Sequence, residues 1–229
     1  MAGTVQLFAT CLGDLFFPEA VEDAESVLRA SGFEVVVPAG QVCCGQPAFN
    51  SGHRRAARRV ARTFLRAFER DVPVVVPSGS CATMLVHYLP ELVGEEPYAV
   101  RELSSFLDTS GVPVPELNRG RRVAYHDSCH MLRELGIADA PRRLLERSGA
   151  TLVPLPRPDL CCGFGGTFSV RQPEVSVALA DEKLAGAGAA DVLVTADPGC
   201  LMHLRGRAAR VDGPPVVHLA SALARGVAA

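Results

Sequence analysis

The sequence of 229 residues lacks the features that mark several classes of protein. It contains no tryptophan, and no uninterrupted apolar run approaches the ~18 residues that a membrane-spanning helix needs. Its first residues show neither the basic segment nor the long apolar segment of a secretory signal peptide. A net charge of −2 gives no bulk attraction to nucleic acids or to anionic membranes. We therefore expect a cytoplasmic globular protein with no nucleic acid partner and no integral membrane segment.

Two common cofactor signatures are also missing. The glycine-rich segment 163–166 has neither the G-x-G-x-x-G pattern of dinucleotide-binding proteins nor the lysine of a P-loop. No two cysteines have the C-x2-C spacing that zinc ribbons and fingers use. In a reducing compartment, clustered cysteines more often indicate metal or redox chemistry than structural disulfides.

What the sequence does contain is one cysteine pattern that occurs twice. In each copy a single cysteine precedes a Cys-Cys-Gly segment by 32 residues, and another follows it by 37 or 38 residues. A repeat of this length indicates that one structural unit has been built twice. The two sets are Cys11, Cys43, Cys44 and Cys81 in the first half, and Cys129, Cys161, Cys162 and Cys200 in the second, which together account for every cysteine.

Strand-like apolar runs alternate with helical patterns in both halves. Strands are predicted at 4–9, 33–37, 72–76, 98–100, 123–125, 151–155 and 191–195, with helices that include 53–70, 141–147 and 175–184. This alternation predicts parallel sheets with right-handed crossovers. We expect two pseudo-symmetric, Rossmann-like α/β domains from an internal duplication, over residues 1–112 and 113–229. The segment 109–120 has prolines and glycines without periodicity and is the predicted linker.

The predicted topology gives the cysteines a common location. Each single cysteine and each Cys-Cys-Gly segment follows a predicted strand, and the carboxyl ends of parallel strands lie along one edge of the sheet. Four thiols spread over 70 or 71 residues should therefore converge in each half.

Four converging thiolates can hold an iron–sulfur cluster or a zinc ion. Adjacent cysteines fit poorly in one compact tetrahedron, whereas a multi-iron cluster offers separate irons to neighbouring thiolates. The glycine after each pair allows a close approach of the backbone and leaves amide groups free to bond sulfide. We expect an iron–sulfur cluster of the 4Fe-4S type in each half, bound by the eight cysteines. Structural zinc and redox-active thiols without metal are the alternatives.

The pattern resembles a known family. The two Cys-Cys-Gly segments with their flanking cysteines are similar to the duplicated CCG cysteine-rich domain found in heterodisulfide reductase, in glycolate oxidase iron–sulfur subunits and in lactate utilisation protein A. Residues 125–130 (Tyr-His-Asp-Ser-Cys-His) and 161–168, in a chain that holds only the two CCG domains, most resemble the lactate utilisation protein A family.

The resemblance implies an iron–sulfur electron-transfer subunit of an oxidoreductase complex, which oxidises L-lactate to pyruvate together with companion subunits. The other interpretations are a zinc-bearing or metal-free scaffold subunit and a thiol–disulfide reductase of the heterodisulfide reductase type. The chain departs from the heterodisulfide reductase pattern at two positions. That pattern has a fifth cysteine three residues after the last one of each set, where this chain has Met84 and His203.

Two polar residues beside Cys129 are candidates for catalysis. An imidazole and a guanidinium, from His130 and Arg133, could handle the proton and the carboxylate of a small 2-hydroxy acid. In the simpler interpretation, His130 hydrogen-bonds a cluster thiolate and Arg133 forms an ordinary ion pair. The helix predicted at 53–70 carries a stripe of arginines, which is either a solvated face or a docking surface for an acidic partner.

Overall fold

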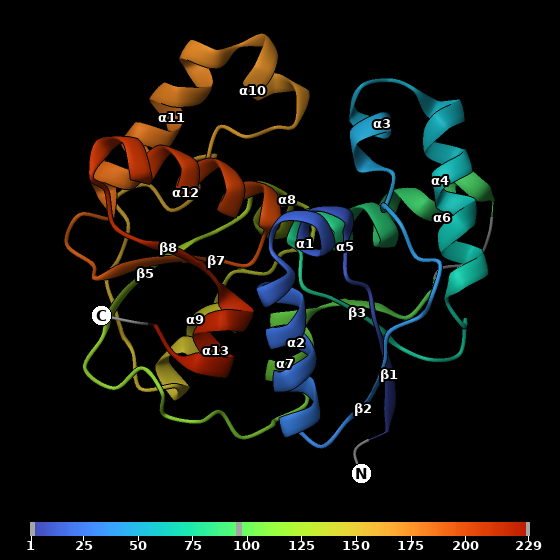
Figure 1. Ribbon diagram of the computed structural model, residues 1–229, viewed down its shortest axis with the longest axis horizontal. Helices are drawn as coiled ribbons and strands as arrows, with labels where there is room; N and C mark the ends of the chain where they lie inside the picture. Colours follow the sequence, from blue (N-terminus) through green and yellow to red (C-terminus); the bar gives the residue numbers. More distant parts are fainter. Residues whose placement is uncertain (1–2, 95–97, 228–229) are drawn as a thin grey trace.

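The fold consists of two four-stranded parallel sheets, one in each half of the chain (Figure 1). It was obtained as a computed structural model, which describes residues 3–94 and 98–227. The first sheet has the order β2-β1-β3-β4 and the second the order β6-β5-β7-β8, so both halves use the same topology. The predicted duplicated α/β fold is therefore confirmed.

The strands are short and pair in parallel throughout. They are β1 (Thr4–Leu7), β2 (Glu34–Val36), β3 (Val74–Val76), β4 (Val100–Glu102), β5 (Arg122–His126), β6 (Thr151–Leu152), β7 (Val192–Thr195) and β8 (Val216–His218). The central strands are almost wholly buried, because helices cover both faces of a parallel sheet.

Three strands differ most from the sequence prediction. β4 begins at Val100, where the predicted strand 98–100 ended. β6 has two residues instead of five, because Pro154 and Pro156 cannot donate ladder hydrogen bonds. The strand β8 was not predicted as a strand, although its segment matches the sequence around β4.

Helices connect the strands, and four of the cysteines lie in the first turns of helices. Those of the first half are α1 (Cys11–Phe16), α2 (Pro18–Ala30), α3 (Gln46–Asn50), α4 (Arg54–Ala67), α5 (Gly79–Thr83), the π-helical turn η1 (Met84–Tyr88), α6 (Leu89–Val93) and α7 (Leu103–Thr109). Those of the second half are α8 (Cys129–Arg133), α9 (Asp139–Arg147), α10 (Thr167–Arg171), α11 (Pro173–Gly186), α12 (Pro198–Val211) and α13 (Leu219–Arg225). Proline starts α2, α11 and α12, where its missing N–H costs nothing.

The two halves share one core. Helix α2 packs against α13, and α7 packs against α9, so that a single apolar cluster includes Leu28 and Leu107 from the first half and Leu144 and Leu223 from the second. The linker is fixed to this core by the fully buried Asn118, whose amide nitrogen donates to Ser148 Oγ (2.8 Å) and to the Ala222 carbonyl (2.9 Å). The halves are thus held in one relative position.

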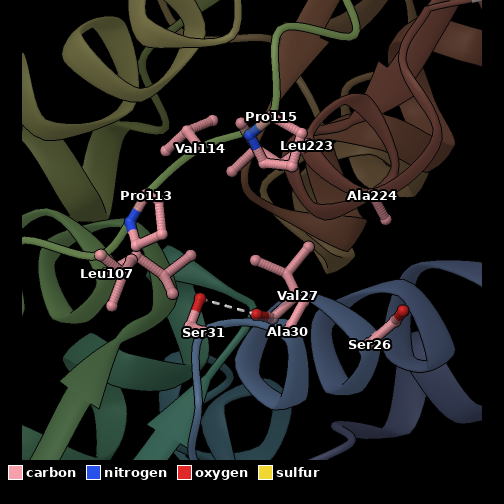
Figure 2. A pocket seen from close by; sticks show the side chains of 11 residues that line it. Ser26, Val27, Ala30, Ser31, Leu107, Pro113, Val114, Pro115, Leu223 and Ala224 are labelled. Atoms are coloured by element: carbon pink, nitrogen blue, oxygen red, sulfur yellow. Dashed lines mark hydrogen bonds between the residues drawn. The ribbon is translucent and has the colours of Figure 1, made fainter.

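A cavity of about 220 Å³ lies between α2, the linker and α13 (Figure 2). Its lining is mostly apolar and includes Val27, Val114 and Leu223. Because helices in these units run antiparallel to the strands, the end of α2 lies at the amino edge of the sheet, away from the cysteines. This cavity is therefore separate from the site predicted at the opposite edge.

Glu102 gives the fold a testable pH dependence. This N-cap of α7 is 2% exposed, and burial raises the pKa of its carboxyl from 4.5 to about 7. The unfolded chain ionises this carboxyl at the lower pH, so this one group should take about 3 kcal/mol from the unfolding free energy as the pH rises from about 4 to 8.

The Glu102→Gln variant has no charge to bury and should lose markedly less stability across the same window. Urea unfolding of both proteins at pH 5 and pH 8 measures the difference. Equal pH slopes for the two proteins would show that Glu102 is not the group responsible.

Candidate metal centres

The four cysteines of the first half meet at the carboxyl edge of its sheet. Cys11 is the first residue of α1, directly after β1, and Cys81 lies in the first turn of α5, directly after β3. The Sγ atoms of Cys11 and Cys43 are 3.5 Å apart, and those of Cys44 and Cys81 are 3.3 Å apart. A hydrogen bond between the thiols of Cys43 and Cys44 joins these two pairs into one cluster.

The second half repeats this arrangement. Cys129 is the first residue of α8, and Cys200 lies in the first turn of α12. The Sγ atoms of Cys162 and Cys200 are 3.2 Å apart, and the Cys129 thiol interacts with that of Cys161, the neighbour of Cys162 in the chain. All eight cysteines are free thiols. This geometry confirms that four thiols converge in each half, as predicted.

The glycine after each cysteine pair turns the backbone toward the sulfur atoms. Gly45 and Gly163 have φ angles of 91° and 93°, in the left-handed region that favours glycine. The Gly45 amide donates to Cys43 Sγ (3.4 Å), and the Gly163 amide donates to Cys161 Sγ (3.3 Å). These donors stabilise negative charge on the sulfur atoms.

One thiol in each cluster is strongly acidic. Hydrogen bonds from Cys11 and Cys44 lower the pKa of Cys43 to about 3. Hydrogen bonds from Cys129 and Cys162 in the same way lower the pKa of Cys161 to about 2. The pKa values of Cys11 and Cys129 are raised, because each donates its proton to a neighbouring sulfur. Each cluster therefore offers a thiolate at neutral pH, which is the form that binds metals.

The two clusters are linked across the boundary between the halves. Asp197 caps α12 by accepting hydrogen bonds from the Gly199 amide (3.0 Å) and the Cys200 amide (3.3 Å). Its other oxygen accepts from the Ser80 amide (2.8 Å) and from the hydroxyl of Ser78 (3.2 Å), the N-cap of α5. The caps of the two helices that carry Cys81 and Cys200 thus contact each other directly.

Helix packing brings the cysteine edges together as well. Helix α5 packs against α8, and α1 packs against α12, so each half places its cysteine-bearing helices against those of the other. A side chain at Gly79 in α5 would lie 2.7 Å from Cβ of Met131 in α8, so only glycine allows this approach.

The structure places His130 and Arg133 in local contacts. Nδ1 of His130 is 2.5 Å from Oε1 of Glu134, whose other oxygen accepts a hydrogen bond from the Tyr88 hydroxyl (2.6 Å). The guanidinium of Arg133 donates to the carbonyl of Asp159 (2.9 Å) in the loop that leads to Cys161. These contacts give both residues positioning roles, and their participation in catalysis stays a prediction.

The two departures from the five-cysteine pattern have structural partners of their own. Met84 is fully buried in the core of the first half. His203 lies behind the second Cys-Cys-Gly loop, where its Nε2 is 3.1 Å from Ser176 Oγ. Ser176 in turn donates to the Gly163 carbonyl (2.8 Å), so His203 supports the loop through this serine.

Sequence reasoning missed the burial of His126 beside the second cysteine cluster. This histidine at the end of β5 is fully buried, and one of its ring nitrogens lies within 4.8 Å of Sγ of both Cys162 and Cys200. Burial lowers its pKa to about 3, so the imidazole is neutral and has a free lone pair. The sequence contains a signal for this burial. The equivalent position of the first half, three residues before Cys11, is the apolar residue Phe8, so His126 occupies a core position of the repeated unit.

Lys183 in α11 holds the loop before the second cysteine pair. It is 2% exposed, and its ammonium donates to the carbonyls of Arg157 (2.7 Å) and Pro158 (3.2 Å). Together with Arg133, it fixes the segment that follows the short strand β6.

Gly163 is the backbone position at which substitution should be most damaging. A Cβ atom at Gly163 would lie 2.3 Å from the Ser176 carbonyl oxygen, whereas a Cβ at Gly94, which has the left-handed φ and ψ of 69° and 33°, meets nothing within 4 Å. Gly163→Ala should therefore lower the unfolding free energy by about 3 kcal/mol or displace the loop, and Gly94→Ala by about 1 kcal/mol. Urea unfolding of the metal-free reduced proteins measures both, and equal losses would contradict the steric explanation.

The donor set fits a metal centre in each half. The thiols are free, close together, partly or fully buried, and supplied with backbone donors.

Within the ranges 3–94 and 98–227, every helix is too short or too polar to span a membrane.

Known proteins show the same organisation. Residues 5–86 and 123–205 each match the cysteine-rich CCG domain. The chain is 43% identical to lactate utilization protein A of Geobacillus kaustophilus, over 96% of this chain and 98% of that protein. It is 42% identical to lactate utilization protein A of Bacillus licheniformis, over 96% of this chain and 98% of that protein. It is 39% identical to lactate utilization protein A 2 of Bacillus cereus, over 97% of this chain and 98% of that protein.

The fold also resembles a solved structure of low sequence similarity. A hypothetical protein from Helicobacter pylori superposes with a TM-score of 0.60 at 12% identity, over 99% of this chain and 49% of that one. This likeness concerns the fold alone. The two matched domains and the full-length similarity to the curated relatives show that the chain belongs to the lactate utilization protein A family.

Proposed function

We propose that the protein is an iron–sulfur electron-transfer subunit of a cytoplasmic oxidoreductase complex that converts L-lactate to pyruvate. The observation that carries the proposal is the convergence of four free thiols at the same sheet edge in both halves. The substrate is taken from the relatives, which are named lactate utilization protein A. Companion subunits would bind the lactate and receive the electrons.

The proposed ligands of the first centre are Cys11, Cys43, Cys44 and Cys81, and those of the second are Cys129, Cys161, Cys162 and Cys200. When bound, an iron–sulfur cluster of the 4Fe-4S type would accept and release single electrons. The chain supplies thiolates, and the amides of Gly45 and Gly163 donate to the sulfur atoms. Hydrogen bonds of this kind adjust the reduction potential of a cluster.

The accessibility of the sites supports electron exchange with partners. Cys11, Cys43, Cys129 and Cys161 are partly exposed, whereas the other four cysteines are buried. Each centre would therefore have one side toward solvent or a partner and one side toward the protein. The hydrogen bond between Ser78 and Asp197 joins the caps of the helices that carry Cys81 and Cys200. The two proposed centres would then lie on either side of the boundary between the halves, an arrangement suited to passing electrons within the chain.

Anaerobic purification tests the proposal. We expect a brown protein that absorbs near ~400 nm and contains several irons with matching sulfide per chain. Lactate should bleach this absorbance only in the presence of the companion subunits. A chain that carries no iron after anaerobic reconstitution would contradict the proposal.

A zinc-bearing scaffold is the second candidate. The observation that favours it is the group formed by His126, Cys162 and Cys200, whose donor atoms lie within 4.8 Å of one another, a separation that a single ion can bridge. This candidate predicts a colourless protein with stoichiometric zinc, and metal analysis of the purified chain distinguishes the two.

A further inference from the structure

The two centres have different surroundings at one equivalent pair of positions. Phe8 and His126 each lie three residues before the first cysteine of their set. Phe8 packs edge-on against the rings of Phe64 and Phe68, with centroid separations of 5.8 and 5.5 Å. His126 takes the same place in the second half, and it is equally buried.

Burying a histidine without partners is unfavourable, and this chain does so beside the second cysteine cluster. Among the described residues, neither ring nitrogen of His126 has a hydrogen-bond partner. A buried polar group without a partner costs about 1–3 kcal/mol. A group absent from the polypeptide that satisfied the imidazole would remove this cost.

A second unsatisfied group lies next to it. Thr195 on β7 is the register partner of His126 on β5, and its fully buried hydroxyl also has no partner within residues 3–94 and 98–227. The equivalent position in the first half is Val76, which is apolar and fully buried. Both polar positions thus occur only in the second half, at adjacent points of the sheet edge.

The sulfur atoms show which group would satisfy the imidazole. A ring nitrogen of His126 and the Sγ atoms of Cys162 and Cys200 all lie within 4.8 Å of one another. A neutral imidazole is the commonest nitrogen ligand of metals in proteins, and thiolates accompany it in mixed sites.

We propose that His126 binds the metal centre of the second half through a ring nitrogen, so that this centre has five protein donors while that of the first half has four. This inference rests on the proposed function, because it assigns a ligand to the cluster proposed there. The two centres would then differ chemically although the folds around them are the same. Thr195 would donate its hydroxyl hydrogen to the bound group.

Pulsed electron paramagnetic resonance of the reduced, iron-loaded chain tests the ligand directly. Wild-type protein is prepared with natural and with ¹⁵N-labelled histidine. We expect a nitrogen coupling of the strength of a direct iron–nitrogen bond, which changes with the label. His126→Phe, which introduces the residue of the first half, should abolish this coupling and leave the centre of the first half intact.

His203→Gln is the matched control, because it removes another histidine near the second cluster and should leave the coupling unchanged. A fully iron-loaded wild-type chain without a directly bonded histidine nitrogen would overturn the inference, and so would a coupling that survives in His126→Phe. The wild-type measurement does not depend on the stability of any variant.

Failure of the proposed function can be told apart from failure of this inference. If the chain takes up Zn²⁺ or Co²⁺ instead of iron, the proposed function is wrong, and the visible bands of Co²⁺ still report whether nitrogen joins sulfur as a ligand. A nitrogen contribution that disappears in His126→Phe would support the assignment. Bands of sulfur ligation alone, or a chain that binds no metal, would overturn it.

Discussion

Replacing Cys43 by serine should remove about half of the iron and sulfide from the reconstituted protein, because one of its two clusters is lost. Serine is nearly isosteric, but its hydroxyl does not ionise near neutral pH and is a poor ligand for iron. The Sγ atom of Cys43 is 3.5 Å from that of Cys11 and accepts a hydrogen bond from the Gly45 amide, so its loss should disrupt the whole first cluster. Iron and sulfide analysis, together with the absorbance near ~400 nm, measures the loss.

Cys161→Ser should have the same effect in the second half, and the double variant should be colourless. Val42→Ser is the matched control, since Val42 precedes Cys43 and its side chain is 50% exposed. It should retain the full iron content. If Cys43→Ser kept all its iron, the first cysteine cluster would not be a metal site.

Asp197→Ala should lower the free energy of unfolding by about 3 kcal/mol. Asp197 is 3% exposed, and its two oxygens accept hydrogen bonds from the first turn of α12 and from Ser78 and Ser80 across the boundary. Alanine removes the helix cap and leaves these donors buried without an acceptor. Urea unfolding of the metal-free, reduced protein separates this effect from any loss of metal.

Asp191→Ala is the control for this substitution. Asp191 is exposed and accepts a hydrogen bond from the Arg122 amide (2.8 Å), so its removal should cost about 1 kcal/mol or less. Ser78→Ala removes the other side of the contact with Asp197. The double variant of Ser78 and Asp197 should lose less stability than the sum of the two single losses, because both single variants remove the same hydrogen bond. Strict additivity would show that the link between the caps contributes nothing.

The fold could be predicted because its signals are local and repeated. Apolar spacing predicts helices at 53–70 and 175–184, and these form as α4 (Arg54–Ala67) and α11 (Pro173–Gly186). The strands were less certain, since β6 is cut to two residues by prolines and β4 is displaced. Short strands depend on their neighbours in the sheet, which a single segment does not reveal.

The cysteine clusters could be predicted for the same reason, but their surroundings could not. The two sets of spacings and the rule for parallel strands are enough to bring four thiols to one edge. The direction of each polar side chain is decided by packing. The sequence places His130 beside Cys129 and His203 at the position of a fifth cysteine in the related pattern, yet their side chains contact Glu134 and Ser176.

The sequence by itself determined that one α/β unit occurs twice and that each copy gathers four cysteines. The cysteine spacing repeats, and the carboxyl ends of parallel strands lie along one edge of a sheet. Only the tertiary structure decided that the caps of α5 and α12 contact each other through Asp197, and that His126 is buried beside Cys162 and Cys200 with no partner among the described residues. These features arise where the halves pack together and where a strand ends inside the core, and such contacts depend on side-chain packing between segments that are far apart in the chain.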